Sequence, residues 1–179
     1  MKFQYFTDKI IWRIIIVHIF AIFFTILAAK QFAELNDIEI IKLLDKYGAE
    51  NSLKELRKEP DSASRIAYYL FWKGISEVIG LLIGFVISLI LFIKKKMFWL
   101  NALIVFIVGL SFIKIGVFKN QIIYRLFFSF DDLFPNVELQ YKFVINGTIL
   151  LLFALFLFFN KWTSNFALNY SMRKESKMA

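Results

Sequence analysis

Four long apolar runs constrain this chain more than any other feature of its sequence. They lie at about residues 10–29, 75–93, 98–118 and 143–159. Crossing the roughly 30 Å of hydrocarbon in a bilayer takes about 20 helical residues, and each run is close to that length. Irregular backbone cannot face lipid, so each run is predicted to be a helix. The sequence therefore predicts an all-α integral membrane protein, a four-transmembrane-helix bundle forming a single membrane domain.

The composition excludes several classes of chemistry. Hydrophobic residues make up 59% of the 179 residues, well above the share in a soluble domain. The chain has no Cys, which excludes disulfides and thiolate sites, and its single His excludes a multi-His metal site. No Gly-rich phosphate loop follows a strand pattern. We therefore predict no catalytic residues, no cofactor and no metal, and a protein that is not an enzyme.

Basic residues gather on one side of the predicted spans. The amino terminus through Arg13, residues 94–96 and the tail 160–179 together hold ten basic and two acidic residues. The intervening segments 30–73 and 119–142 are each balanced, with eight and three residues of either sign. The positive-inside rule then places both termini in the cytoplasm of a multi-pass plasma (inner) membrane protein, bacterial in type. The basic face predicts anionic lipid headgroups as partners, and no nucleic acid.

The two outer segments are predicted to be helical. Residues 30–74 form a small extracytoplasmic cap, with Asn36 capping a first helix that stops at Gly48 and Ser52 capping a second. A third cap helix is expected to start near Ser62 and to continue unbroken into the second span.

The segment 119–142 is rich in aromatic residues and predicts an amphipathic helix in the outer headgroup layer, with a lid over a ligand cavity as the alternative. Within it, Asp131 and Asp132 favour an exposed helix end over a cation site.

Small residues predict how the spans pack. One side of the second span carries a residue of this kind every fourth position, and the third span carries two Gly seven residues apart; these are Ser76, Gly80, Gly84, Ser88, Gly109 and Gly116. Helices in lipid associate through close backbone approach, which such strips permit. Whether the strip on the second span faces inward or toward a second copy stays open.

Polar side chains inside the spans predict an intramembrane cluster. Glu77, Lys114 and Asn146 each lie about one turn inside the outer end of a different span, so they are expected at one level. We predict that Glu77 pairs with Lys114 and that Asn146 hydrogen-bonds to either. The pair is architectural, or both side chains snorkel to the surface, or the cluster binds a ligand or passes an ion.

His18 is the other polar group of the predicted cluster. It lies in the inner half or middle of the first span and is expected to be neutral, with a hydrogen bond to Ser88 or Asn101. The alternative is a proton relay, for which only Glu77 offers a second titratable group.

Two classes of function follow from these features. The first is a non-enzymatic accessory or interaction component that binds a protein partner, or a second copy of itself, through its helices and outer cap. The alternative is an oligomeric carrier or channel for a small solute or lipid, with the four residues of the polar cluster lining the path. An enzyme acting on lipid would need paired acids or His clusters inside the spans, which the sequence lacks.

Overall fold

The computed structural model describes residues 10–56, 61–95, 97–120, 122–123 and 136–160, and these ranges are helical with no strand. The long helices are α2 (Trp12–Glu34), α3 (Ile38–Leu56), α4 (Ser62–Lys94), α5 (Leu100–Ile115) and α7 (Leu139–Phe159). Two short 3-10 helices, η1 (Leu35–Asp37) and η2 (Val117–Lys119), follow α2 and α5. Residues 121 and 124–135 of the predicted interfacial segment 119–142 and residues 161–179 of the tail lie outside the described residues.

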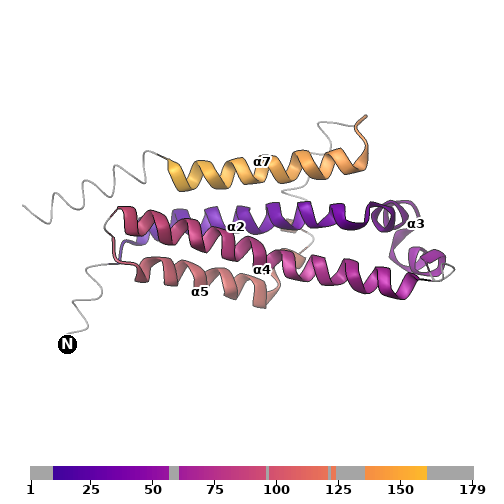
Figure 1. Cartoon of the computed structure of the whole chain (residues 1–179), viewed down its shortest axis with the longest axis horizontal. Coiled ribbons are helices and arrows are strands. Elements are labelled where there is room, and N and C mark those ends of the chain that lie inside the picture. The colour runs from indigo at the N-terminus through magenta and orange to yellow at the C-terminus, as the bar shows by residue number, and fades with distance from the viewer. Residues whose placement is uncertain (1–9, 57–60, 96, 121, 124–135, 161–179) are drawn as a thin grey trace, which may run out of the picture.

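Helix α2 is the centre of the bundle. Figure 1 shows α7 along one side of α2 and α4 with α5 along the other. Aliphatic side chains of α2, such as Ile15, Ile22 and Ile26, are fully buried against these neighbours. Helices α4 and α7 pack extensively on α2 but make few contacts with each other. Helices α4 and α7 are therefore held together mainly through α2.

The glycines of α4 explain why α2 and α4 approach so closely. A Cβ atom on Gly80 would lie 2.6 Å from the Cα of Ile26, and one on Gly84 would lie 2.7 Å from the Cγ1 of Ile22. No side chain fits at such distances, so the two backbones are in direct contact. The small-residue strip therefore faces inward onto α2, which answers the question that the sequence left open.

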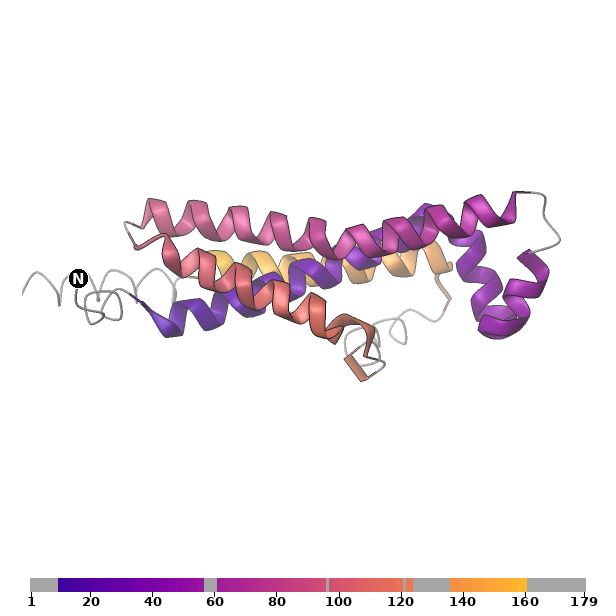
Figure 2. The same cartoon turned by 90° about the horizontal axis from the view of Figure 1, so that it is seen from below.

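Helix α4 is much longer than the predicted second span. It contains 33 residues, or about 50 Å at 1.5 Å per residue, and runs unbroken from Ser62 as predicted. Figure 2 shows it extending along the whole bundle to the end where α3 lies. We call that end of the molecule the cap end.

Helix α5 is shorter than the predicted third span. It has 16 residues and ends at Ile115 because Gly116 adopts a left-handed conformation, with φ 75°. A Cβ on Gly116 would meet only the Lys119 side chain, at 3.7 Å. The predicted packing role of Gly116 was therefore wrong, and this glycine terminates the helix. Gly109 does pack, because a Cβ there would collide with Leu81 of α4.

The start of the cap differs from the prediction by one residue. The Oδ1 atom of Asp37 accepts the backbone N–H of Ile40 at 3.1 Å, which is the bond expected of an N-cap residue. Asn36 instead donates back to the carbonyl of Ala33 at 2.9 Å. The predicted capping by Asn36 was wrong because the α2 backbone continues five residues past the apolar run.

Gly48 interrupts α3 as predicted, with φ 70° and ψ 170°. Ser52 does not cap a second helix. Its hydroxyl donates to the carbonyls of Leu43 and Gly48 and is fully buried, so it holds the two halves of α3 together at the bend.

An ion pair fixes α3 and η1 to α4. The guanidinium of Arg65 donates to Asp37 Oδ1 at 2.8 Å and to Glu39 at 3.1 Å. Burial alone raises the pKa of the Asp37 carboxyl, but the hydrogen bond and charge of Arg65 and the amide of Ile40 outweigh it, so the pKa lies below its usual value. A small core of Ile40 and Leu56 from α3 and Tyr69 from α4 packs between the same two helices.

Candidate functional site

A buried ion pair lies where α2, α4 and η2 meet. The Nζ atom of Lys30 donates to Glu77 Oε1 at 2.8 Å and to the carbonyl oxygen of Phe118 at 2.7 Å. The side chains of Lys30 and Glu77 are 8% and 9% exposed. One ammonium group therefore connects three segments of the chain, and Glu77 has a charged partner in the interior.

The predicted pairing of Glu77 with Lys114 was wrong. Lys114 lies on an exposed face of α5. The backbone carbonyl of Phe118, just past the end of α5, approaches the ion pair instead. Glu77 is buried as expected of a paired carboxylate, but its counter-ion comes from α2.

Lys30 was missed because the first apolar run stops at Ala29, which places Lys30 in the outer loop. A signal was present in the sequence. Lys30 follows Ile22 and Ile26 at intervals of four residues, so an α2 continuing past Ala29 carries Lys30 on the same buried face.

Glu34, one helical turn after Lys30 in α2, is a second buried carboxylate. Glu34 accepts a hydrogen bond from the hydroxyl of Tyr69 at 2.5 Å and pairs with Lys73 Nζ at 2.9 Å. Lys73 also donates to the Tyr69 oxygen at 3.0 Å. Together with the Lys30–Glu77 pair, this cluster gives α2 and α4 two charged contacts at the cap end.

A cavity of about 480 Å³ lies beside these groups. Its lining combines three lysines and one glutamate with a few apolar residues: Lys30, Leu70, Lys73, Gly74, Glu77, Ile113 and Lys119. Within the described ranges, no group of three His, Cys, Asp or Glu side chains is close enough to hold a metal ion. The cavity offers charged hydrogen-bonding groups, and its lining contains no hydroxyl nucleophile beside a base.

His18 lies far from this cluster. It precedes Lys30 by twelve residues, or about 18 Å along α2. Its Nδ1 atom is 3.0 Å from the hydroxyl of Ser88, one of the two partners expected from the sequence. The ring stacks on Phe92 with centroids 4.6 Å apart and meets the edge of Phe158. Asn101, the other expected partner, accepts the backbone N–H of Ile11.

Asn146 is also part of the predicted cluster. It is buried on α7, with 1% of its surface exposed. Of the predicted cluster, Glu77 therefore has a lysine partner, Lys30, that the prediction did not include. His18 lies away from that pair and contacts Ser88.

The His18–Ser88 contact leads to a stability prediction. Replacing Ser88 with Ala should lower the free energy of unfolding by about 1 kcal/mol, because the buried imidazole loses a hydrogen-bond partner. Ser111→Ala is the matched control, since Ser111 is exposed and its hydroxyl donates within its own helix, to the carbonyl of Ile107. Equilibrium unfolding in mixed micelles measures both variants. Equal effects of the two substitutions would contradict the prediction.

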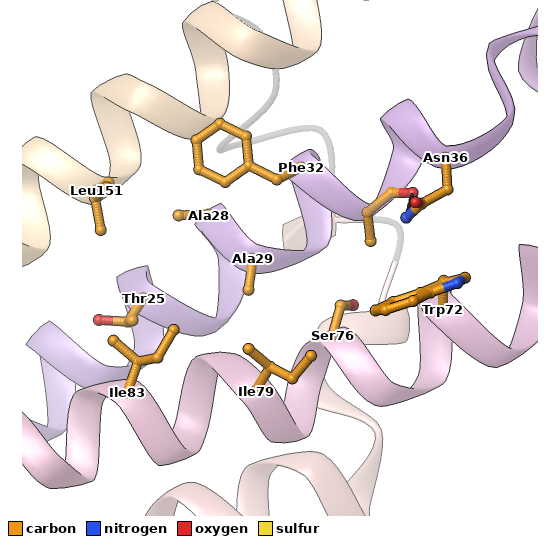
Figure 3. A pocket seen from close by; sticks show the side chains of 11 residues that line it. Thr25, Ala28, Ala29, Phe32, Asn36, Trp72, Ser76, Ile79, Ile83 and Leu151 are labelled. Atoms are coloured by element: carbon orange, nitrogen blue, oxygen red, sulfur yellow. Dashed lines mark hydrogen bonds between the residues drawn. The ribbon is translucent and has the colours of Figure 1, made fainter.

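A second hollow, apolar in character, lies between α4 and α7 on the face opposite α5. Figure 3 shows Thr25, Ala28 and Ala29 of α2 between Ile79 and Ile83 of α4 on one side and Leu151 of α7 on the other. We call this hollow the α4–α7 groove; it has a volume of about 310 Å³, and the remaining residues of its lining are Phe32, Ala33, Asn36, Trp72 and Ser76. The groove forms because α4 and α7 make few contacts with each other and because the α2 side chains between them, Thr25, Ala28 and Ala29, are too small to fill the space.

The helices define the class of protein to which the chain belongs. Three of them, which begin at Trp12, Ser62 and Leu139, are long and apolar enough to cross a membrane, and α5 is a shorter apolar helix. The chain is thus a helical membrane protein with candidate transmembrane helices. It matches no protein-family model, no curated protein and no solved structure.

Proposed function

We propose that the protein crosses the membrane four times, with α5 as the third span and both termini in the cytoplasm. At about 24 Å, α5 is shorter than the hydrocarbon layer. The contacts of Lys30 support the proposal, because they bring the end of α2, the outer part of α4 and the end of α5 to one level. If consecutive spans alternate in direction, the end of the first, the start of the second and the end of the third lie on the same side of the membrane.

Within the plasma membrane we assign the protein a non-enzymatic role, as an accessory or interaction component that binds a protein partner through its helices and its cap. One observation carries the assignment. Helix α4 projects past the predicted span 75–93, and there Tyr68, Leu70 and Phe71 are 54–59% exposed. Large exposed apolar side chains next to a folded cap are typical of an interaction surface. Anionic lipid headgroups at the cytoplasmic face are the second expected partner.

The alternative role as an oligomeric carrier has less support. A path through the bundle would have to join Glu77 to His18. The lining of the cavity at Glu77 contains Lys30, Lys73 and Lys119 but not His18. The His18 ring is packed between Phe92 and Phe158 and is 1% exposed.

Site-specific photo-crosslinking in native membranes tests the interaction role. A photoreactive residue at Phe71 is expected to give a discrete protein adduct, while one at Ile90, exposed on the same helix within the span, is expected to react with lipid. A Phe71 position that yields no protein adduct, together with solute flux through liposomes holding the purified protein, would instead favour the carrier.

The topology has its own test. A reporter enzyme that works only in the cytoplasm should be active when it is fused after Ala179. A reporter enzyme that works only outside the cytoplasm should be active when it is inserted at the bend near Gly48. A carboxyl-terminal reporter active outside the cytoplasm would overturn the four-span arrangement, whatever the outcome of the crosslinking.

A further inference from the structure

We propose that the cavity beside the Lys30–Glu77 pair binds a phosphate group, carried by a phospholipid or by a soluble molecule. The hydrogen-bond donors to that group are the ammonium groups of Lys30, Lys73 and Lys119. This phosphate site goes beyond the proposed interaction role and does not depend on it. It rests on the shape of the cavity, on the charges that line it and on an ammonium group without an acidic partner.

The cavity forms because α5 covers only part of the length of α4. Helix α5 ends at Ile115, and Figure 2 shows α4 continuing well past that end toward α3. The lining residues of α4 recur at intervals of three or four and so lie on one face of the helix: Leu70, Lys73, Gly74 and Glu77. A Cβ atom on Gly74 would meet nothing within 4 Å, so this face is open at the glycine.

The charged groups of the cavity are not balanced. Glu77 pairs with Lys30, and Glu34, which lies outside the lining, pairs with Lys73. Lys119 also lines the cavity and has no acidic partner among the described residues. Two carboxylates thus balance two of the three ammonium groups. One positive charge is left, and a ligand with one negative charge would neutralise it.

Hydrogen-bond donors remain on all three lysines. An ammonium group has three N–H donors. The ammonium of Lys30 donates to two acceptors, and that of Lys73 also donates to two. Each of these groups therefore keeps one donor, and within the described part of the chain Lys119 keeps all of its donors. The lining thus presents donors from three separate side chains to one hollow.

A phosphate group matches these donors better than a carboxylate does. A phosphodiester carries the single negative charge that the cavity lacks, and it offers more acceptor oxygens than a carboxylate to three lysines. Lysine binds phosphate as a point charge, without the paired geometry that arginine imposes. The volume of about 480 Å³ is many times what one water molecule needs, and Leu70 and Ile113 add apolar walls. The cavity therefore admits the phosphate together with part of the molecule that carries it.

Two lysines near the end of α5 provide a charge test. Lys119→Gln removes the ammonium group without an acidic partner, and Lys114→Gln removes an exposed one that is not among the lining residues. The full chain in neutral detergent is titrated at constant ionic strength with phosphatidylglycerol, with its headgroup glycerophosphoglycerol, or with inorganic phosphate. Binding is measured as the rise in the midpoint of thermal unfolding. Wild type and Lys114→Gln should bind equally, and Lys119→Gln about tenfold more weakly.

A Gly74→Leu variant tests the location of the site. A Cβ atom meets nothing at this position, so the larger side chain enters the cavity without a steric conflict at the helix backbone. The substitution also raises helix propensity, so the midpoint without ligand should not fall. The affinity should fall at least about tenfold, because the side chain occupies the space of the ligand. Gly74→Ala adds only a methyl group and should keep most of the affinity.

The three ligands distinguish the two sources of the phosphate. A midpoint raised by inorganic phosphate or by glycerophosphoglycerol assigns the site to a soluble molecule, and one raised by phosphatidylglycerol alone assigns it to a lipid headgroup. Diacylglycerol, which has the acyl chains without the phosphate, is the negative control.

Three outcomes would overturn the phosphate site. The first is that none of the three ligands stabilises wild type, and the second is that diacylglycerol stabilises it as much as phosphatidylglycerol does. The third is that either Lys119→Gln or Gly74→Leu binds as tightly as wild type. Loss of the phosphate site would leave the crosslinking at Phe71 unaffected, so the two proposals can fail independently.

Discussion

Replacing Lys30 with Met is expected to destabilise the protein by about 3–5 kcal/mol. Glu77 is 9% exposed on its side chain, and the substitution removes the ammonium group that lies 2.8 Å from its carboxylate. The carbonyl of Phe118 also loses its donor. A buried charge without a counter-ion costs far more than the intact pair contributes, so the loss should be large.

Two further variants give this prediction its control. Replacing Lys30 and Glu77 together with Met should restore most of the lost stability, because no charge then remains buried in the interior. Lys114→Met should change the unfolding free energy by less than about 0.5 kcal/mol, since Lys114 is exposed. Equilibrium unfolding in mixed micelles measures all three. If the double variant is as unstable as Lys30→Met, the two side chains do not depend on one another.

Gly80→Ala is expected to have a comparable effect for a steric reason. The added methyl group would lie 2.6 Å from the Cα of Ile26 and 2.9 Å from the carbonyl oxygen of Thr25. Both neighbours are backbone atoms, so relief requires α2 and α4 to separate along their whole contact. We expect a loss of about 3 kcal/mol, at the upper end of the range for overpacking.

The same helix provides a matched glycine. A Cβ on Gly74 meets nothing within 4 Å, and the residue lies six positions before Gly80 in α4. Gly74→Ala should therefore stabilise the helix, by up to about 1 kcal/mol, because Ala has the higher helix propensity. The unfolding midpoints of the two variants should move in opposite directions. A shift in the same direction would show that helix propensity, and not the contact with α2, dominates at Gly80.

The two largest effects concern the same pair of helices. The glycines bring the α2 and α4 backbones together, and the buried charges at Lys30, Glu77 and Glu34 join them at the cap end. Small side chains permit two helices in lipid to approach closely, and a charge buried away from water must meet its counter-ion. We infer that the glycine strip sets how closely α2 and α4 approach and that the ion pairs set their register.

The helical class and several element boundaries could be predicted from local patterns. The apolar runs, the bend at Gly48 and the unbroken passage from Ser62 into the second span all depend on neighbouring residues. The place of Glu77 inside the second long apolar helix also followed, because it depends on the local pattern of one segment. The extension of α2 to Glu34 did not, since polar residues past an apolar run look like a loop until their partners are known.

The sequence by itself determined a helical chain with spans that a membrane can accommodate, because hydrophobic length and backbone hydrogen bonding are properties of each segment alone. Only the tertiary structure decided that α2 is central, that Glu77 meets Lys30 and not Lys114, and that a groove remains between α4 and α7. Each of these depends on which faces of separate helices meet. In lipid that choice follows from close steric fit and from a few buried charges, which the linear pattern of apolar residues does not encode.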